Sequence, residues 1–212
     1  MRKMTPRLVV GAGFALLAAS VCSLAAEGEA VDPHAHHHQM MAEADAAGIQ
    51  RSTGEYALPE QRLVRDDGKA VDFLAELNDG RPVYLNFIYT TCTTICPLSS
   101  QVFSMLQQKL GAGRDKVHLM SVSIDPEQDT PARLRAYAGK FHAGPGWTHY
   151  TGTSAASIAV QRAFNAFRGD KMNHTPLTLY RAAPGQAWVR LDGFATADQL
   201  LGEYKTGSAA GT

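Results

Sequence analysis

One stretch, residues 84–97, constrains the fold of this chain more than any other. It runs Tyr-Leu-Asn-Phe-Ile-Tyr-Thr-Thr-Cys-Thr-Thr-Ile-Cys-Pro, so an apolar and aromatic segment ends in Cys92, Cys96 and Pro97. The apolar segment predicts a buried strand. Proline is favoured in the first turn of a helix, where its missing N–H costs nothing. We therefore expect two thiols where a strand ends and a helix begins, beside unpaired N–H groups that stabilise a thiolate.

The spacing of the two cysteines limits their chemistry. On a regular helix, residues four apart have Cβ atoms about 5–6 Å apart, whereas a disulfide needs roughly 3.5–4.5 Å. A bond between Cys92 and Cys96 therefore requires an irregular segment. A soft metal ion fits the gap better: copper, as Cu(I) or Cu(II), held by two thiolates and an imidazole, with Zn²⁺ as the competitor. Inert core packing is the remaining interpretation, and the four threonines around the cysteines argue against it.

The N-terminus predicts export. Three basic residues, Arg2, Lys3 and Arg7, precede an apolar run that ends in small residues. This is the layout of a secretory signal peptide, with an uncleaved N-terminal anchor as the alternative. We expect this leader to span residues 1–26. The rest of the protein is then periplasmic, or membrane-anchored and facing the periplasm.

Removal of the leader leaves a slightly acidic chain. The whole sequence has 20 basic and 20 acidic side chains, and the leader takes away three basic ones, which leaves 17 against 20 and a formal charge of −3. No basic patch stands out, so we expect no nucleic-acid partner. Cys22 lies within the leader, where Val21 before it is a poor match to a lipid-attachment signal. The mature chain keeps Cys92 and Cys96, and a bond that closes so short a loop adds little stability.

Residues 27–51 form a second segment, rich in Ala, Glu, Asp and His, that we expect to be flexible. Short histidine tracts bind metals, and neighbouring methionines add soft ligands for Cu(I). A solvated linker or the remnant of a purification tag are the other interpretations. The predicted auxiliary metal ligands here are His34, His36, His37, His38, Met40 and Met41.

The body, residues 52–206, is long enough for one domain, with residues 207–212 as a tail. Hydrophobic periodicity, caps and turn residues predict its elements. The expected strands are 56–63 and 70–74 (a hairpin), 82–89, 117–124, 147–150, and 176–180 with 188–191 (a second hairpin); the expected helices are 97–110, 130–141, 154–167 and 196–204. This order predicts an α/β class, a thioredoxin-like fold with a central mixed β-sheet flanked by helices and an N-terminal β-hairpin extension.

A third ligand is expected among the histidines of the body. His174 precedes Thr175-Pro176 at the start of a predicted strand. In a thioredoxin-like fold the proline that opens this strand is often cis, and an X–Pro bond tolerates that form. We therefore predict a cis Thr175–Pro176 bond that places His174 near the two cysteines. The other candidates, His118, His142 and His149, are interpreted as structural or surface residues.

The motifs together resemble the Sco/SenC family of copper-handling, thioredoxin-like proteins. The resembling residues are Phe87 to Pro97 with its CxxxCP, Ser121 to Pro131 with SIDPEQDT, and His174-Thr175, and the likeness covers about residues 55–206. The resemblance implies that Cys92, Cys96 and His174 bind one copper ion. It further implies a metallochaperone that delivers copper to, or maintains the cysteines of, the binuclear copper site of cytochrome c oxidase subunit II. The recipient of the copper could instead be another extracytoplasmic copper protein. A copper donor protein is the expected partner that supplies the metal.

The chain departs from the family at two positions. Asn173 stands where Asp often precedes the histidine, and Pro176 is closer to the thioredoxin pattern. Asp125 is expected to face the site as an outer partner of the metal ligands, and Asp129 to start a helix. Residues 168–172 are expected to form a loop that could gate the site, and its Met172 is interpreted as a surface residue or a spare soft ligand.

Two other functions remain open at this point. A periplasmic thiol–disulfide oxidoreductase would use Cys92 and Cys96 as a redox pair, without an obligatory metal. Cys92 would attack, and Cys96, at the helix N-terminus, would be the resolving partner or the more stable thiolate. A peroxidase of the peroxiredoxin kind expects a proline shortly before the attacking cysteine. Residues 86–91 contain none, which disfavours it.

Overall fold

The computed structural model describes residues 48–209, and these are built around one mixed sheet of eight strands. The strand order across the sheet is β1-β8-β7-β4-β5-β6-β2-β3. The strands are β1 (Gln50–Gly54), β2 (Arg62–Arg65), β3 (Ala70–Asp72), β4 (Val83–Ile88), β5 (His118–Ser123), β6 (Trp147–Thr151), β7 (Leu177–Arg181) and β8 (Trp188–Asp192).

The centre of the sheet is parallel and its two sides are antiparallel. β4, β5 and β6 run parallel to one another, with Val83 paired to His118 and Ile88 to Ser123. β7, β8 and β1 add antiparallel strands on one side, and the β2–β3 hairpin adds two on the other. The predicted central mixed sheet and both predicted hairpins are therefore present. The first strand of the N-terminal hairpin was predicted over 56–63 and is instead β2 at Arg62–Arg65, since residues 55–61 form no strand.

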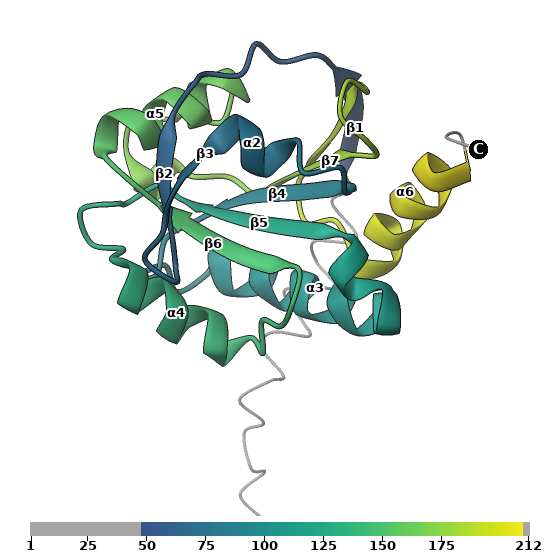
Figure 1. The fold of residues 1–212 in the computed structure, drawn as a ribbon, viewed down its shortest axis with the longest axis horizontal. Helices are drawn as coiled ribbons and strands as arrows, with labels where there is room; N and C mark the ends of the chain where they lie inside the picture. The colour runs from purple at the N-terminus through teal and green to yellow at the C-terminus, as the bar shows by residue number, and fades with distance from the viewer. Residues whose placement is uncertain (1–47, 210–212) are drawn as a thin grey trace, which may run out of the picture. The chain divides into compact units, whose positions relative to one another are not determined.

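Helices cover both faces of this sheet (Figure 1). α2 (Phe73–Leu77) and α5 (Ser154–Ala163) lie on one face, and α3 (Ile95–Leu110) and α4 (Pro131–Lys140) on the other. α6 (Ala197–Ala209) packs beside α3. Two short 3-10 helices, η1 (Gly111–Lys116) and η2 (Lys171–Asn173), complete the described elements.

Strand β4 joins the cores of the two faces because its side chains alternate. Val83, Leu85 and Phe87 belong to the cluster that includes Val160 of α5. Tyr84 belongs to the opposite cluster, with residues of α3 and α6. All six residues of β4 are buried, as the continuous apolar run predicts. The cysteine loop therefore begins from one of the most firmly packed strands of the protein.

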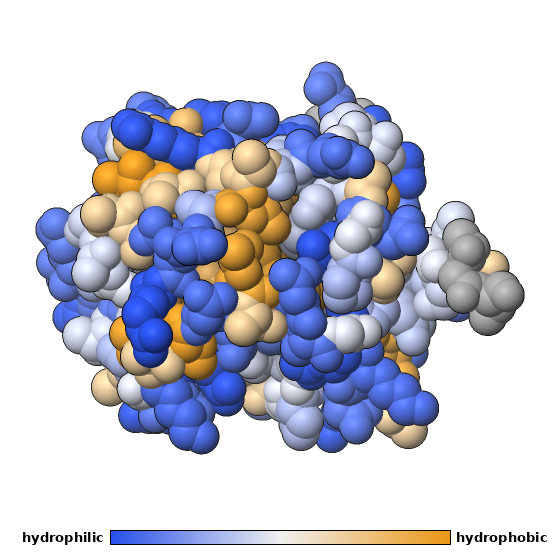
Figure 2. All heavy atoms as spheres, turned by 45° about the horizontal axis from the view of Figure 1, so that its top comes forward, coloured by the Kyte–Doolittle hydropathy of each residue, from blue (hydrophilic) through white to orange (hydrophobic). Residues whose placement is uncertain are grey.

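The face that carries α2 and α5 shows hydrophobic residues in the hollows between hydrophilic side chains (Figure 2). The connection between β1 and β2 runs over this side, and its Tyr56 and Leu58 pack against the core. The ring of Tyr56 meets that of Phe164 edge to face, with ring centroids 5.0 Å apart. This connection therefore closes the core and is part of the folded body.

Several predicted boundaries were wrong. The last two residues of the segment expected to be flexible, 50 and 51, belong to β1, which pairs with β8. The strand predicted over 70–74 ends at Asp72, because the Asp72 carboxylate accepts a hydrogen bond from the N–H of Ala75 and caps α2.

The ends of two helices also differ from the prediction. α5 stops at Ala163, four residues early, since Asn165 adopts a left-handed φ of 52° that no helix continues through. α6 continues to Ala209, so the helix takes up part of the predicted tail. At its start the Thr196 hydroxyl accepts from the N–H of Gln199, as predicted for an N-cap.

The leader and the His/Met segment lie outside the described residues, apart from the last positions of that segment. Within residues 48–209, no helix combines the length and the apolar character needed to cross a membrane.

Candidate functional site

The two cysteines lie at the carboxyl end of β4, where α3 begins. Thr94 is the N-cap residue of α3 but makes no side-chain capping bond. Instead, the N–H of Cys96 donates to Cys92 Sγ at 3.3 Å. The sulfur of Cys92 therefore replaces the missing cap and sits at the positive end of the helix dipole.

This position separates the pKa values of the two thiols. The pKa of Cys92 is well below its ordinary value, chiefly because the Cys96 thiol hydrogen-bonds to it, and then because of the N–H groups of Cys96 and Thr94 and the hydroxyl of Tyr89. The pKa of Cys96 is raised by the same hydrogen bond and by burial. Both cysteines are free thiols without a disulfide, Cys92 8% exposed and Cys96 fully buried. Cys92 is thus the thiolate of the pair.

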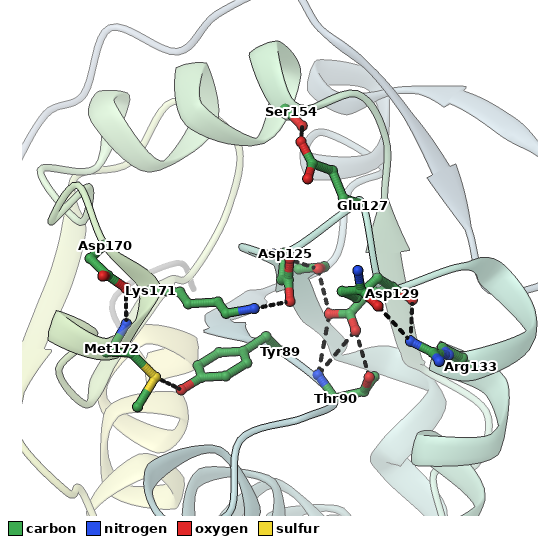
Figure 3. A network of polar contacts seen from close by, with 12 residues as sticks. Tyr89, Thr90, Asp125, Glu127, Asp129, Arg133, Ser154, Asp170, Lys171 and Met172 are labelled. Atoms are coloured by element: carbon green, nitrogen blue, oxygen red, sulfur yellow. Dashed lines mark hydrogen bonds and ion pairs between the residues drawn. The ribbon is translucent and has the colours of Figure 1, made fainter.

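Asp129 ties the cysteine loop to the neighbouring strand (Figure 3). Its carboxylate is fully buried and accepts from the Thr90 N–H at 3.1 Å and from the Thr90 hydroxyl at 2.5 Å. It also accepts from the Ser123 hydroxyl at 2.6 Å. Because Thr90 follows β4 and Ser123 ends β5, one carboxylate fixes where the loop leaves the sheet. Asp129 comes directly before the N-cap of α4, Thr130, where a helix start was predicted.

Asp125 faces the segment that carries His174. Its Oδ2 lies 2.6 Å from Lys171 Nζ, and that ammonium group lies 5.6 Å from the centre of the Tyr89 ring (Figure 3). The Asp125 side chain is 11% exposed. It therefore pairs with a lysine and holds the loop before His174 against the end of β5.

His174 is buried and its ring is oriented by the main chain. Its Nε2 lies 3.0 Å from the carbonyl oxygen of Phe87, so Nε2 carries the proton and donates it. Burial lowers the pKa of His174, while this hydrogen bond and the charge of Cys92 oppose the shift. The imidazole is therefore neutral near pH 7, with Nδ1 as its lone-pair donor.

The predicted cis bond before Pro176 was wrong. The peptide bonds of the described residues are all trans. An X–Pro bond still prefers trans by about 0.5–1 kcal/mol. His174 directly follows the short helix η2, three residues before β7 begins, and the chain enters β7 without a cis bond.

The three predicted ligands share one end of the sheet but do not form a closed ligand set. Among residues 48–209, no three His, Cys, Asp or Glu side chains are gathered closely enough to hold a metal ion. Cys92 contacts Cys96, and His174 is near enough to Cys92 for its charge to affect the imidazole. A low-pKa thiolate, a second thiol and a neutral imidazole fit a soft metal as donors.

The other histidines of the body have structural surroundings. His118 Nδ1 lies 3.0 Å from an Asp79 carboxylate oxygen, and its Nε2 lies 2.9 Å from the Tyr150 hydroxyl. His149 stacks on Trp147 at 5.1 Å, and burial lowers the pKa of His149 to about 3. His142 is exposed, with a left-handed φ of 55°. The predicted auxiliary ligands, residues 34–41, lie outside the described residues.

Sequence reasoning missed Tyr89 and Lys171 and left Met172 undecided. Tyr89 donates its hydroxyl to Met172 Sδ at 3.7 Å, and burial raises the pKa of Tyr89 to about 12, so it stays protonated. The signal for Tyr89 was its place at the end of the apolar run that leads to the cysteines. A cavity of about 390 Å³ lies beside His174 and is also lined by Asp125, Arg168 and Lys171.

The model of the family described as SCO1/SenC matches residues 50–201. The chain is 37% identical over 93 residues to the "SCO1 protein homolog" of Bacillus subtilis, covering 43% of this chain and 47% of that protein. It is 32% identical over 101 residues to a "Putative copper-binding protein" of Stutzerimonas stutzeri, covering 47% and 48%. The chain thus spans about half the length of the curated relatives it matches.

Two solved structures are similar over most of the described residues. BsSco, described as a member of the Sco family of cytochrome c oxidase assembly proteins with a disulfide switch, matches with a TM-score of 0.63 and 25% identity, covering 74% of this chain and 96% of that one. ScoI of Bradyrhizobium japonicum, solved with copper bound, matches with a TM-score of 0.58 and 26% identity, covering 71% and 99%. These likenesses confirm the predicted thioredoxin-like fold. Because the family model matches well over half of the sequence, this chain belongs to the SCO1/SenC family.

Proposed function

We propose that this protein is an exported copper chaperone whose cargo is held by Cys92, Cys96 and His174. It delivers copper to, or maintains the cysteines of, the binuclear copper site of cytochrome c oxidase subunit II. The observation that carries the proposal is the thiolate of Cys92, hydrogen-bonded to a second thiol and close to a neutral imidazole. Membership of the SCO1/SenC family and a copper-bound relative support copper as the metal.

Each of the three side chains has a distinct task in holding the metal. Cys92 offers a thiolate without losing a proton, whereas Cys96 must release its proton as copper binds. His174 keeps the Nε2 proton on the Phe87 carbonyl and offers Nδ1, and such a second hydrogen bond orients a ligating imidazole. Two thiolates and an imidazole suit both Cu(I) and Cu(II).

Export and the auxiliary tract complete the proposal. Residues 1–26 direct the chain to the periplasm, as a free or membrane-anchored protein. His34, His36, His37, His38, Met40 and Met41 then add capture capacity. A copper donor protein loads the site, and subunit II or another extracytoplasmic copper protein receives the metal.

An anaerobic copper titration of the reduced protein tests the site. We expect one tightly bound copper per chain, and at least a hundredfold weaker binding in Cys92→Ser, Cys96→Ser and His174→Ala. The matched control is His142→Asn, an exposed histidine whose left-handed φ asparagine tolerates. It should bind copper like the wild type. Unchanged affinity in His174→Ala would refute the ligand assignment.

A second candidate function rests on the same sulfur geometry. A thiolate at Cys92 beside a thiol at Cys96 is also the arrangement of an attacking and a resolving cysteine. The similar protein BsSco is described as having a disulfide switch. A thiol–disulfide oxidoreductase would keep its activity in His174→Ala and lose it in Cys92→Ser. Equilibration of the cysteine pair with glutathione, followed by acid trapping, measures whether the pair cycles.

A further inference from the structure

Met172 exposes its side chain to an unusual degree. It is 73% exposed, and no other large hydrophobic side chain among residues 48–209 is classed as exposed. It stands in η2, two residues before His174, in a segment of otherwise polar residues. An apolar side chain left in water contributes nothing to the core, so a role in folding does not account for it.

The sulfur of Met172 is nevertheless held in place. The N–H of Met172 donates to Asp170 Oδ1 at 2.8 Å, which fixes the turn. The preceding Lys171 is paired with Asp125 across the site. The hydroxyl of Tyr89 then donates to Met172 Sδ at 3.7 Å (Figure 3). The thioether is therefore displayed at a defined position on the rim.

Tyr89 connects this exposed sulfur with the buried thiolate. Its side chain packs in the same buried cluster as both cysteines. Tyr89 therefore links a thioether that solvent reaches with two cysteine sulfurs that solvent barely reaches. Met172 is 73% exposed and Cys92 only 8%, so the thioether is the more accessible of the two sulfurs.

We propose that Met172 is a transient Cu(I) ligand, which accepts the metal at the rim and passes it inward to Cys92. This inference rests on the proposed copper function and names the entry point of its site. A thioether is soft enough to select Cu(I), yet it is neutral and binds less firmly than a thiolate, as a relay requires.

The exchange needs no electron transfer. A lone pair of Met172 Sδ forms a bond to Cu(I) as one bond from the donor's ligand breaks. The Cys92 thiolate then bonds to copper and displaces the thioether. Copper stays Cu(I) throughout, and Cys96 loses its proton to solvent when it joins as the second thiolate.

The rate of copper uptake distinguishes a transient ligand from one that holds copper in the final complex. Reduced full-length protein is mixed anaerobically with the Cu(I)–bicinchoninate complex, and loss of the complex's colour is followed by stopped flow. Met172→Leu, which keeps size and apolarity but lacks sulfur, should take up copper at least fivefold more slowly, with an equilibrium affinity within twofold of wild type. Met172→His should restore the rate, because imidazole also binds Cu(I). The control Met105→Leu, on α3, should transfer at the wild-type rate.

The outcomes are distinct for the two proposals. If the wild type binds copper tightly and Met172→Leu takes up copper at the same rate, the relay proposal is overturned. The proposed chaperone site is then unaffected. A wild type that takes up no copper removes the proposed function itself.

Protection of Met172 from oxidation tests metal binding at the thioether directly, without a transfer measurement. In Cys92→Ser, Ag(I), a redox-inert substitute for Cu(I), should slow the oxidation of Met172 by hydrogen peroxide, as measured by peptide mass spectrometry. Oxidation at an unchanged rate would contradict direct binding at the thioether.

Discussion

The main-chain N–H of Cys96 donates a hydrogen bond to the sulfur of Cys92, 3.3 Å away. The bond closes the first turn of α3 and stabilises a negative charge on the outer of two neighbouring thiols. The Cys96 thiol stabilises the same charge more strongly, so the two cysteines interact although a CxxxC pair on a regular helix is too widely spaced for a disulfide.

The first prediction concerns the ionisation of the pair. Because the pKa of Cys92 is lowered and that of Cys96 raised, the reduced protein should hold one thiolate near pH 7, measured by absorbance at 240 nm. Cys96→Ala removes the largest stabilising hydrogen bond, so the pKa of Cys92 should rise. Two thiols that ionise together near the ordinary thiol pKa of about 8.5 would contradict this.

The second prediction concerns Asp129. Replacing it by Asn places an amide donor among the N–H of Thr90 and the hydroxyls of Thr90 and Ser123. We expect a loss of about 2 kcal/mol in the free energy of unfolding, measured by urea denaturation. The alkylation rate of Cys92 should change as well, because the loop loses its anchor. Asp198→Asn, whose side chain is 77% exposed, is the control and should change neither quantity.

The third prediction is a loss of stability in mild acid caused by His149. Burial lowers the pKa of this histidine to about 3, so the folded state holds it neutral while the unfolded chain protonates it near 6.5. The free energy of unfolding is therefore unaffected by His149 above pH 6.5, and it decreases as the pH drops from 6.5 toward 3. At pH 5 the loss should be about 2 kcal/mol.

The control for this effect is His149→Phe, which keeps an aromatic ring beside Trp147. The drop in unfolding free energy between pH 7 and pH 5, from urea melts, should be smaller in this variant than in the wild type. Equal drops would assign the acid sensitivity to another group, such as His118, whose pKa burial also lowers.

The fourth prediction couples cargo to stability. A ligand that binds only the folded protein, present at a free concentration a thousandfold above its dissociation constant, adds about 4 kcal/mol. For a domain of this size that corresponds to a rise in Tm on the order of 10 °C. Calorimetry of the reduced protein with and without buffered Cu(I) measures it. His174→Ala should lose most of the rise, and His142→Asn should keep it.

Much of the fold followed from local patterns. The apolar run over 82–89 predicted β4 closely, because a strand buried on both faces has few polar interruptions. Thr130 and Pro131 marked the start of α4 through capping chemistry that needs no tertiary context. β1 escaped prediction because its residues, QRSTG, are polar and mostly exposed, and only pairing with β8 makes them a strand.

The candidate site was harder to foresee. The positions of Cys92 and Cys96 followed from the strand and the proline, but the cap made by a sulfur depends on loop geometry. The Asp129 carboxylate accepts from Thr90, 39 residues away in the chain, as well as from nearby Ser123, so its motif indicated only a helix start. The trans bond before Pro176 shows the limit of analogy, because η2 brings His174 to the site by another path.

The carboxylate of Asp129 joins the ends of two strands that pair only in the folded chain. An unfolded chain therefore carries two ordinary cysteines, whereas the finished domain carries one thiolate at a fixed place. Reactivity is in this way postponed until folding is complete. The pairing of β4 with β5 is in this sense a condition for the reactivity of Cys92.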